Sequence, residues 1–242
     1  MGWKLSTIFI NSNKEINDVE LFNSLGFQDI TPIEPKAFEE ILNPEDGELY
    51  IGHYKDSTIL CIPTLPYLFL EASLSNEESI LMNTFPNTDI SSLVLQSVVN
   101  FWGFTLIKDG TKVRAKGGSS EEGLLVDFGT PLKEELELLK NSKINADGER
   151  VYHLDAYPDE EFTEDELGEE YVFKVCERYI GATLDHADDL LFETKFRGYS
   201  YKDTHEDSKQ SEKIEKKTKW IKFIIYIAIF FILRFAVKHL LE

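Results

Sequence analysis

Cysteine is scarce in this chain of 242 residues, which has only Cys61 and Cys176. Two cysteines at this separation form neither a disulfide framework nor a Cys-x-x-Cys metal site, and their use favours a reducing cytoplasm. Basic residues are also few: 25 Lys and Arg stand against 44 Asp and Glu, for a net charge of −19. Phosphate recognition needs a basic surface, so nucleic acid is excluded as an expected partner.

Recognisable catalytic motifs are missing as well. The sequence has no His-Glu-x-x-His, no Gly-x-Ser-x-Gly and no glycine loop in the P-loop order. These patterns carry the zinc, nucleophile and phosphate chemistry of many enzymes. We therefore assign no catalytic, cofactor-binding or metal-ligating residue, expect no cofactor, and leave enzymatic activity uncertain, leaning towards none.

The sequence does contain enough apolar residues for a folded core. Hydrophobic residues make up 42% of the chain and aromatic residues 12%, which excludes wholesale disorder. The charge is divided unevenly. Residues 1–200 hold 38 acids and 16 bases, a net of −22, whereas residues 201–242 hold 6 acids and 9 bases, a net of +3. The chain is an acidic body with a basic tail.

The longest apolar run lies in that tail, where residues 220–241 read WIKFIIYIAIFFILRFAVKHLL. As a helix, these residues would reach roughly 33 Å, enough to cross a hydrocarbon core of about 30 Å. The alternatives are a buried core helix and an amphipathic surface helix. Crossing is favoured because Phe223–Leu233 is apolar all round, while Lys222 and Arg234 can extend towards the headgroups. The predicted membrane anchor comprises Trp220, Lys222, Phe223, Ile224, Ile225, Tyr226, Ile227, Ala228, Ile229, Phe230, Phe231, Ile232, Leu233 and Arg234.

The flanks of this run predict its orientation. Lysines precede it at positions 213, 216, 217 and 219, and the positive-inside bias places them in the cytoplasm. The expected organisation is a cytoplasmic domain at 1–197, a charged linker at 198–219 and a transmembrane helix at 220–241. This is the layout of a single-pass, tail-anchored membrane protein whose N-terminal domain is cytoplasmic.

The body shows mixed strand and helix signals. Strands are predicted at 3–10, 49–54, 58–63, 97–107, 112–116 and 124–128, and helices at 18–25, 35–42, 131–140 and 163–181. Asp109-Gly110 suits a type I′ turn between two of these strands. Strands and helices do not alternate regularly. The predicted fold is therefore α+β, an antiparallel β-meander with flanking helices, plus one C-terminal transmembrane helix.

Two acidic segments invite a metal hypothesis. Residues 155–170 hold nine carboxylates without EF-hand spacing, and a solvated face explains them better. Asp185, His186 and Asp188 group an imidazole with carboxylates, for which a surface loop is the favoured interpretation. Whether these three residues and Asp127 converge is left open.

The middle of the chain resembles a known family. The pattern Ser97-Val98-Val99-Asn100-Phe101-Trp102-x-Phe104, then Asp109-Gly110-x-x-Val113-Arg114, then Gly123-x-x-x-Asp127-x-Gly129-x-Pro131-Leu132 is similar to a bacterial family of unknown function. The resemblance spans about residues 90–185, and it implies a cytoplasmic bacterial α+β domain without implying any activity.

These observations lead to one leading hypothesis and two rivals. We expect a tail-anchored protein whose acidic domain binds an unidentified protein partner at the lipid bilayer. The first rival is a membrane-tethered, metal-dependent enzyme with clustered carboxylates such as Asp127, Asp185 and Asp188. The second is an acidic surface that engages a basic partner. The affinity of such a complex would fall steeply as the salt concentration rises.

Overall fold

The computed structural model describes residues 2–146, 148, 150–154 and 157–202. The chain divides into two units, 1–201 and 202–242, and nearly all described residues belong to the first. The predicted linker from residue 203 and the predicted anchor at 220–241 lie outside the described residues.

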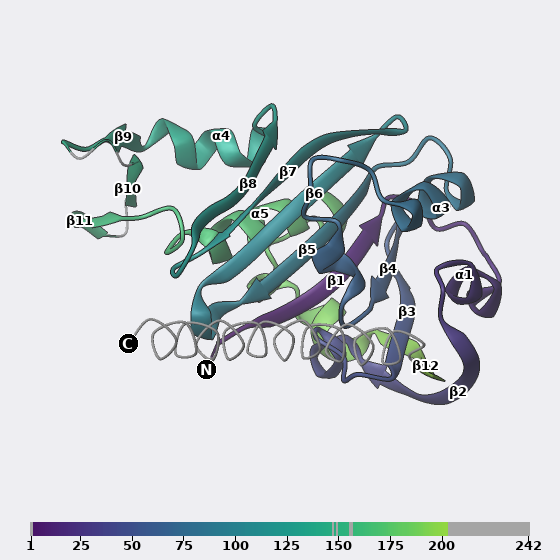
Figure 1. Cartoon of the computed structure of the whole chain (residues 1–242). Helices are drawn as coiled ribbons and strands as arrows, with labels where there is room; N and C mark the ends of the chain where they lie inside the picture. The colour runs from purple at the N-terminus through teal and green to yellow at the C-terminus, as the bar shows by residue number, and fades with distance from the viewer. Residues whose placement is uncertain (1, 147, 149, 155–156, 203–242) are drawn as a thin grey trace, which may run out of the picture. The chain divides into compact units, whose positions relative to one another are not determined.

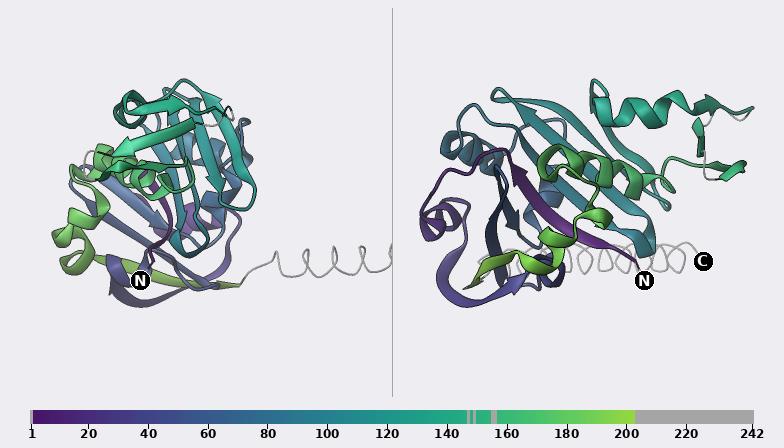
Figure 2. Two further views of the ribbon diagram at one scale, coloured as in Figure 1. Left: turned by 90° about the vertical axis from the view of Figure 1, so that its left-hand side faces the viewer. Right: turned by 180° about the vertical axis from the view of Figure 1, so that it is seen from behind.

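A nine-stranded, mostly antiparallel sheet forms the centre of the first unit (Figures 1 and 2). In spatial order its strands are β2 (Gln28–Ala37), β12 (Lys195–Lys202), β3 (Glu48–Tyr54), β4 (Ser57–Cys61), β1 (Lys4–Ile10), β5 (Ile90–Gln96), β6 (Phe101–Lys108), β7 (Thr111–Ser119) and β8 (Gly123–Gly129). Only part of this order follows the sequence, because β1 lies between β4 and β5, and β12 lies between β2 and β3.

Of the four strands from β5 to β8, β6, β7 and β8 correspond to strands that the sequence predicts, whereas β5 lies outside the predicted strands. β6 and β7 pair through Lys108↔Thr111, and the turn residues Asp109 and Gly110 both have positive φ, as a type I′ turn requires. β7 continues to Ser119, so residues 117–119 extend the strand beyond its predicted end at residue 116. These four strands do form a consecutive antiparallel run.

Helices cover both faces of the sheet. One face, here named the α5 face, carries α5 (Gly168–Ile180), and the other, the α3 face, carries the helices that lead into and out of β1–β5. The latter are α1 (Asp18–Ser24), α2 (Leu65–Leu68) and α3 (Asn76–Thr84). β1 shows the reason for this arrangement: Leu5 and Phe9 belong to the core under α5, whereas Ile8 and Ile10 belong to the other core. A strand buried on both faces must occupy the middle of a sheet.

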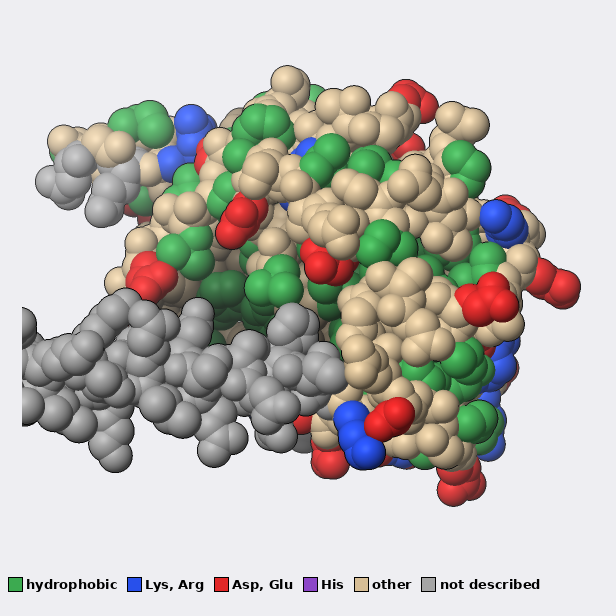
Figure 3. Space-filling view, turned by 45° about the vertical axis from the view of Figure 1, so that its right-hand side comes forward, with side chains coloured by type: hydrophobic (Ala, Val, Ile, Leu, Met, Phe, Trp, Pro, Cys, Tyr) green, Lys and Arg blue, Asp and Glu red, His purple; other side chains and the backbone are tan. Residues whose placement is uncertain are grey.

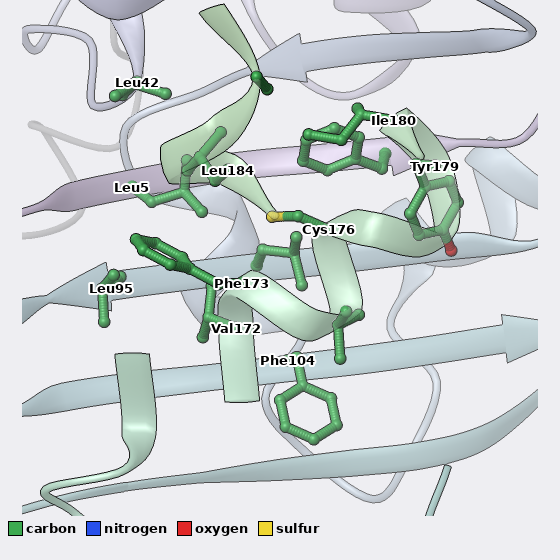
Figure 4. Close-up of a cluster of buried hydrophobic side chains, with 14 of the residues drawn as sticks. Leu5, Leu42, Leu95, Phe104, Val172, Phe173, Cys176, Tyr179, Ile180 and Leu184 are labelled. Carbon is green, nitrogen blue, oxygen red and sulfur yellow. The ribbon is translucent and has the colours of Figure 1, made fainter. Parts of the chain in front are cut away.

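The packing of α5 follows from its sequence period. Leu167, Tyr171, Val175 and Tyr179 are all buried, as their i, i+4 spacing predicts. Figure 4 shows side chains of α5, among them Val172, Cys176 and Ile180, in one cluster with side chains of β1, β5 and β6. Short helical turns extend this layer, namely η1 (Phe38–Ile41), η2 (Ser97–Val99), η3 (Leu184–His186) and η4 (Asp189–Glu193).

A smaller sheet and one helix lie beside the end of the large sheet that carries β8 (Figure 1). They are α4 (Lys133–Lys140) and the three antiparallel strands β9 (Ser142–Ile144), β10 (Arg150–Leu154) and β11 (Tyr157–Phe162). β11 falls inside the acidic run that the sequence analysis interprets as a solvated face.

The predicted fold class is wrong. The described chain is mostly antiparallel sheet with few helices, and its strand order departs from a meander because β1 and β12 insert between other strands. Sequence neighbours cannot reveal such insertions, since they join segments far apart in the chain. The fold class also included a transmembrane helix, and no helix in the described part of the chain has the length and apolarity to cross a membrane.

Several element boundaries also differ from expectation. The helix predicted at 35–42 is replaced by the end of β2 and the short η1. The helix predicted at 163–181 begins later than expected, because α5 starts at Gly168. The Thr163 N–H nevertheless donates to Glu166 Oε2 at a distance of 2.7 Å, as in a capping box. β12 runs to Lys202, so residues 198–202 of the expected linker form a strand.

Candidate functional site

Trp102 on β6 forms the floor of the candidate site. Its buried indole stacks on the ring of Tyr171 from α5, with 5.4 Å between the ring centroids and an interplanar angle of 14°. Helix α5 starts on top of this indole at Gly168, where a methyl side chain would overlap the ring. The indole Nε1–H is buried and has no hydrogen-bond partner among the described residues. An unpaired buried donor is costly, and here the start of α5 covers it, because a Cβ on Gly168 would lie 2.7 Å from Nε1.

A buried ion network lies beside the tryptophan on the α5 face. Arg114 donates from Nε to Glu135 Oε1 (2.7 Å) and from Nη2 to Glu135 Oε2 (2.6 Å), and its Nη1 contacts Asp127 Oδ1 at 2.5 Å. Burial by itself would lower the pKa of Arg114, but the two carboxylates outweigh that effect and raise it. Lys116 contacts Glu164 and lies 3.6 Å from Glu135 Oε2. The network therefore ties β7 to α4 and to the loop before α5.

Two tyrosines complete the network. The Tyr171 hydroxyl donates to the Tyr152 hydroxyl (2.9 Å), which in turn donates to Glu164 Oε1 (3.0 Å). Burial is the main cause that raises the pKa of both phenols, so both stay protonated and can donate. Lys116 Nζ also lies 4.3 Å from the centroid of the Tyr171 ring. Glu164 is therefore fully engaged, which fixes the loop that follows it.

A β-bulge in β7 directs the basic side chains. Lys112 pairs with Ile107 and Arg114 with the adjacent Leu106, so Val113 is an extra residue in the ladder. Without the bulge, Lys112 and Arg114 would share one face. With it, Lys112 reaches the α3 face, where its Nζ contacts Glu78 at 2.7 Å, and Arg114 reaches the α5 face.

The candidate site is a hollow of about 290 Å³ next to this network, which we name the acidic groove. Its walls come from β5, η2, β6, the small sheet and the start of α5. The residues that line it are Leu95, Ser97, Asn100, Trp102, Leu154, Phe162, Asp165, Glu166, Leu167, Glu169 and Glu170.

Four carboxylates gather in the acidic groove. Glu169 accepts a 2.5 Å hydrogen bond from the Ser97 hydroxyl, and the Thr163 hydroxyl lies 2.7 Å from Asp165 Oδ1 and 2.8 Å from Glu166 Oε2, so that it can donate to one of them. Among the described residues, no basic side chain pairs with any of these carboxylates or with Glu170. On the face shown in Figure 3, acidic side chains are spread among apolar and uncharged ones. The groove thus concentrates negative charge in a concave site, which strengthens its attraction for a cation.

Two other hollows are less suited to a ligand. The larger, about 560 Å³, lies between Trp3, Leu42 and Phe192 and contains both Lys4 and glutamates. The other, about 380 Å³, surrounds Asp18, whose carboxylate already accepts two hydrogen bonds from Arg197 and one from Tyr199. The first hollow therefore mixes charges of both signs, and in the second the Asp18 carboxylate is already paired with Arg197.

The residues of the metal hypothesis lie in separate contacts. Asp127 pairs with Arg114, while His186 Nδ1 lies 3.1 Å from Asp185 Oδ1 and 2.9 Å from the Thr183 hydroxyl. Asp188 precedes η4. Within the described ranges, no group of three or more His, Cys, Asp or Glu side chains could hold a metal ion.

Sequence patterns predicted neither the buried ion network nor the acidic groove. One signal was available, because Lys112, Arg114 and Lys116 place three bases in five residues of a chain that is poor in bases. Their spacing indicates charges inside a strand, but it does not reveal the bulge or the burial. Trp102 was recognised only as part of a family pattern.

The comparisons with known proteins give a family and no activity. The search of curated proteins and the search of solved structures found no match. A family model matches residues 21–182, which is more than half of the chain and includes both the buried ion network and the acidic groove. The expected resemblance to an uncharacterised family is confirmed, and the chain belongs to a family of unknown function, DUF6928.

Proposed function

We propose that this domain is a binding module that takes up a basic segment of a partner protein in the acidic groove. The observation that carries this proposal is the presence of four carboxylates without basic partners beside a buried, unpaired indole N–H. A binding function for the acidic domain is the leading expectation from the sequence, and the open carboxylates of the groove support this proposal.

The chemistry of the groove favours a peptide over a free metal ion. Lys or Arg side chains of a partner would pair with Glu169 and Glu170, which accept charge-assisted hydrogen bonds from such donors. The apolar wall formed by Leu95, Leu154 and Phe162 would contact the aliphatic stems of those basic side chains. The volume of 290 Å³ lies near the lower end for small-molecule sites and suits one or two side chains.

The test uses a fluorescent oligo-arginine peptide and the purified full chain. In Glu169→Gln/Glu170→Gln, two of the groove charges are removed while the side-chain size is kept. We expect binding about tenfold weaker than for the unchanged chain, which corresponds to about 1.4 kcal/mol for two partly exposed ion pairs. Fluorescence anisotropy titrations at several salt concentrations measure this, and affinity should fall as salt rises.

The matched control removes two adjacent acids elsewhere. Glu45→Gln/Asp46→Asn has the same charge change on an exposed loop, and it should alter binding far less. Equal weakening in both double variants would mean that the peptide responds only to total charge, and the proposed site would then be wrong. An oligo-glutamate peptide should not bind either form.

Three further statements stay predictions from the sequence. We propose attachment to a membrane through residues 220–241, supported by the apolar run and its lysine flank. We also propose that the partner is met at the cytoplasmic side of that membrane, and that the family is bacterial. All three rest on sequence patterns, and the predicted attachment segment lies outside the described residues.

A further inference from the structure

The two edges of the large sheet are built differently. The edge strand β2 contains Pro32 and Pro35, which have no N–H to donate, and it carries Glu34 and Lys36. Prolines and charges of this kind protect an edge against pairing with another strand. The opposite edge strand, β8, contains no proline and reads Gly-Leu-Leu-Val-Asp-Phe-Gly.

β8 is also apolar and exposed. Leu124, Leu125 and Phe128 are 44%, 48% and 37% exposed, and no other strand in the described part of the chain pairs with the outer side of β8. Gly117 pairs with Val126 while the adjacent Gly118 pairs with Leu124, so a bulge makes Leu125 an extra residue. The bulge explains why apolar side chains reach both faces of the strand.

The one charge on β8 is neutralised within the domain. Asp127 contacts the Arg114 guanidinium at 2.5 Å, and Arg114 also donates to the Phe128 carbonyl at 3.0 Å. A second strand that approaches β8 therefore meets no unpaired charge on the strand itself.

We infer that β8 pairs antiparallel with β8 of a second copy of this chain. A two-fold axis near Val126 places residues 123–125 of each copy opposite residues 127–129 of the other, so the leucines meet the half that carries Phe128. The same arrangement brings Glu121 and Glu122 of one copy towards Lys133 of the other, whose side chain is 79% exposed. The proline-containing β2 edge stops further addition, so association closes at two copies.

Disulfide trapping in the purified full chain tests this pairing. The native Cys61 and Cys176 are fully buried, so they should not react under mild oxidation. In Val126→Cys, the new thiol would face its own copy across the axis, at the 4.5–5.5 Å Cβ separation of paired residues. We expect a covalent dimer to form at least about tenfold faster than in Thr31→Cys, which places an exposed thiol on the β2 edge.

A second pair of variants separates pairing from random collision. Adding Leu125→Glu to Val126→Cys puts like charges at the paired edge and should slow trapping to the Thr31→Cys rate. Adding Leu68→Glu, at an exposed apolar position of α2, should leave the trapping rate unchanged. Equal trapping rates for Val126→Cys and Thr31→Cys, or trapping that survives Leu125→Glu, would overturn the inference. The outcome is independent of the groove, because Glu169→Gln/Glu170→Gln should not alter trapping.

Discussion

At the scale of single residues, Gly168 decides how closely α5 approaches the sheet. Its Cα lies against the pyrrole part of Trp102, and a Cβ there would overlap the ring. The need for glycine comes from this contact and not from backbone conformation, since Gly168 is not among the positive-φ glycines. The close approach also places the acidic start of α5 beside the indole that forms the floor of the groove.

We predict that Gly168→Ala lowers the free energy of unfolding by about 3 kcal/mol, because the helix must shift to avoid overlap in a packed core. Urea unfolding followed by tryptophan fluorescence measures the change. Glu177→Ala, on the exposed side of the same helix, should stay within about 0.5 kcal/mol of the unchanged chain. A stable Gly168→Ala with an unshifted midpoint would show that α5 packs less tightly than described.

At the scale of elements, one glutamate joins β7 to α4. Glu135 is buried, pairs with Arg114 through both carboxylate oxygens, and also accepts from the Leu132 N–H at 2.7 Å. This last contact explains why α4 starts at Lys133, with Leu132 as its cap, two residues after the predicted start at residue 131. The same pairing directs Glu135 into the interior, while the next residue, Leu136, is exposed.

We predict that Glu135→Leu destabilises the domain by about 3–5 kcal/mol, since it leaves much of the charge of buried Arg114 uncompensated. Glu137 on the same helix pairs with Lys174 at 2.7 Å but is largely exposed, so Glu137→Gln should leave the unfolding midpoint unchanged. Urea titrations of both variants measure the contrast. Similar midpoints would mean that the ion network contributes no more than an exposed pair.

At the scale of the whole molecule, the charge of −19 is a sum over two unlike parts. The described domain holds most of the acids, and a like-charged bilayer surface should repel it. The lysines just before position 220 should instead be attracted to that surface, because their charge is opposite to it. If the tail attaches to a membrane, this difference in charge would hold the groove away from the lipid and open to a partner.

We predict that the full chain sediments with membranes, and that a chain ending at residue 219 stays in the supernatant. The physical reason is the transfer of the apolar run at 220–241 out of water. Cell fractionation at low salt without detergent measures this. Recovery of the full chain in the supernatant would contradict membrane attachment, and sedimentation of the shortened chain would place the attachment elsewhere.

Local patterns predicted the parts of the fold that depend on near neighbours. The Asp109-Gly110 turn, the strands on either side of it and the buried face of α5 all follow from residues a few positions apart. The strand order did not follow, because β1 and β12 pair with segments that are distant in sequence. The groove was missed for the same reason, since Ser97 and Glu169 meet only in the folded chain.

The sequence by itself determined the acidic character of the domain, the turn chemistry and the periodic helix face, because composition and short spacings act locally. Tertiary structure decided which charges are paired and which stay open. The bulge at Val113 directs Lys112 and Arg114 to opposite faces, and burial selects Glu135 and Glu164 as ion partners. A buried charge must be paired and an exposed one need not be, so Glu135 is paired within the network while the four carboxylates of the groove stay open.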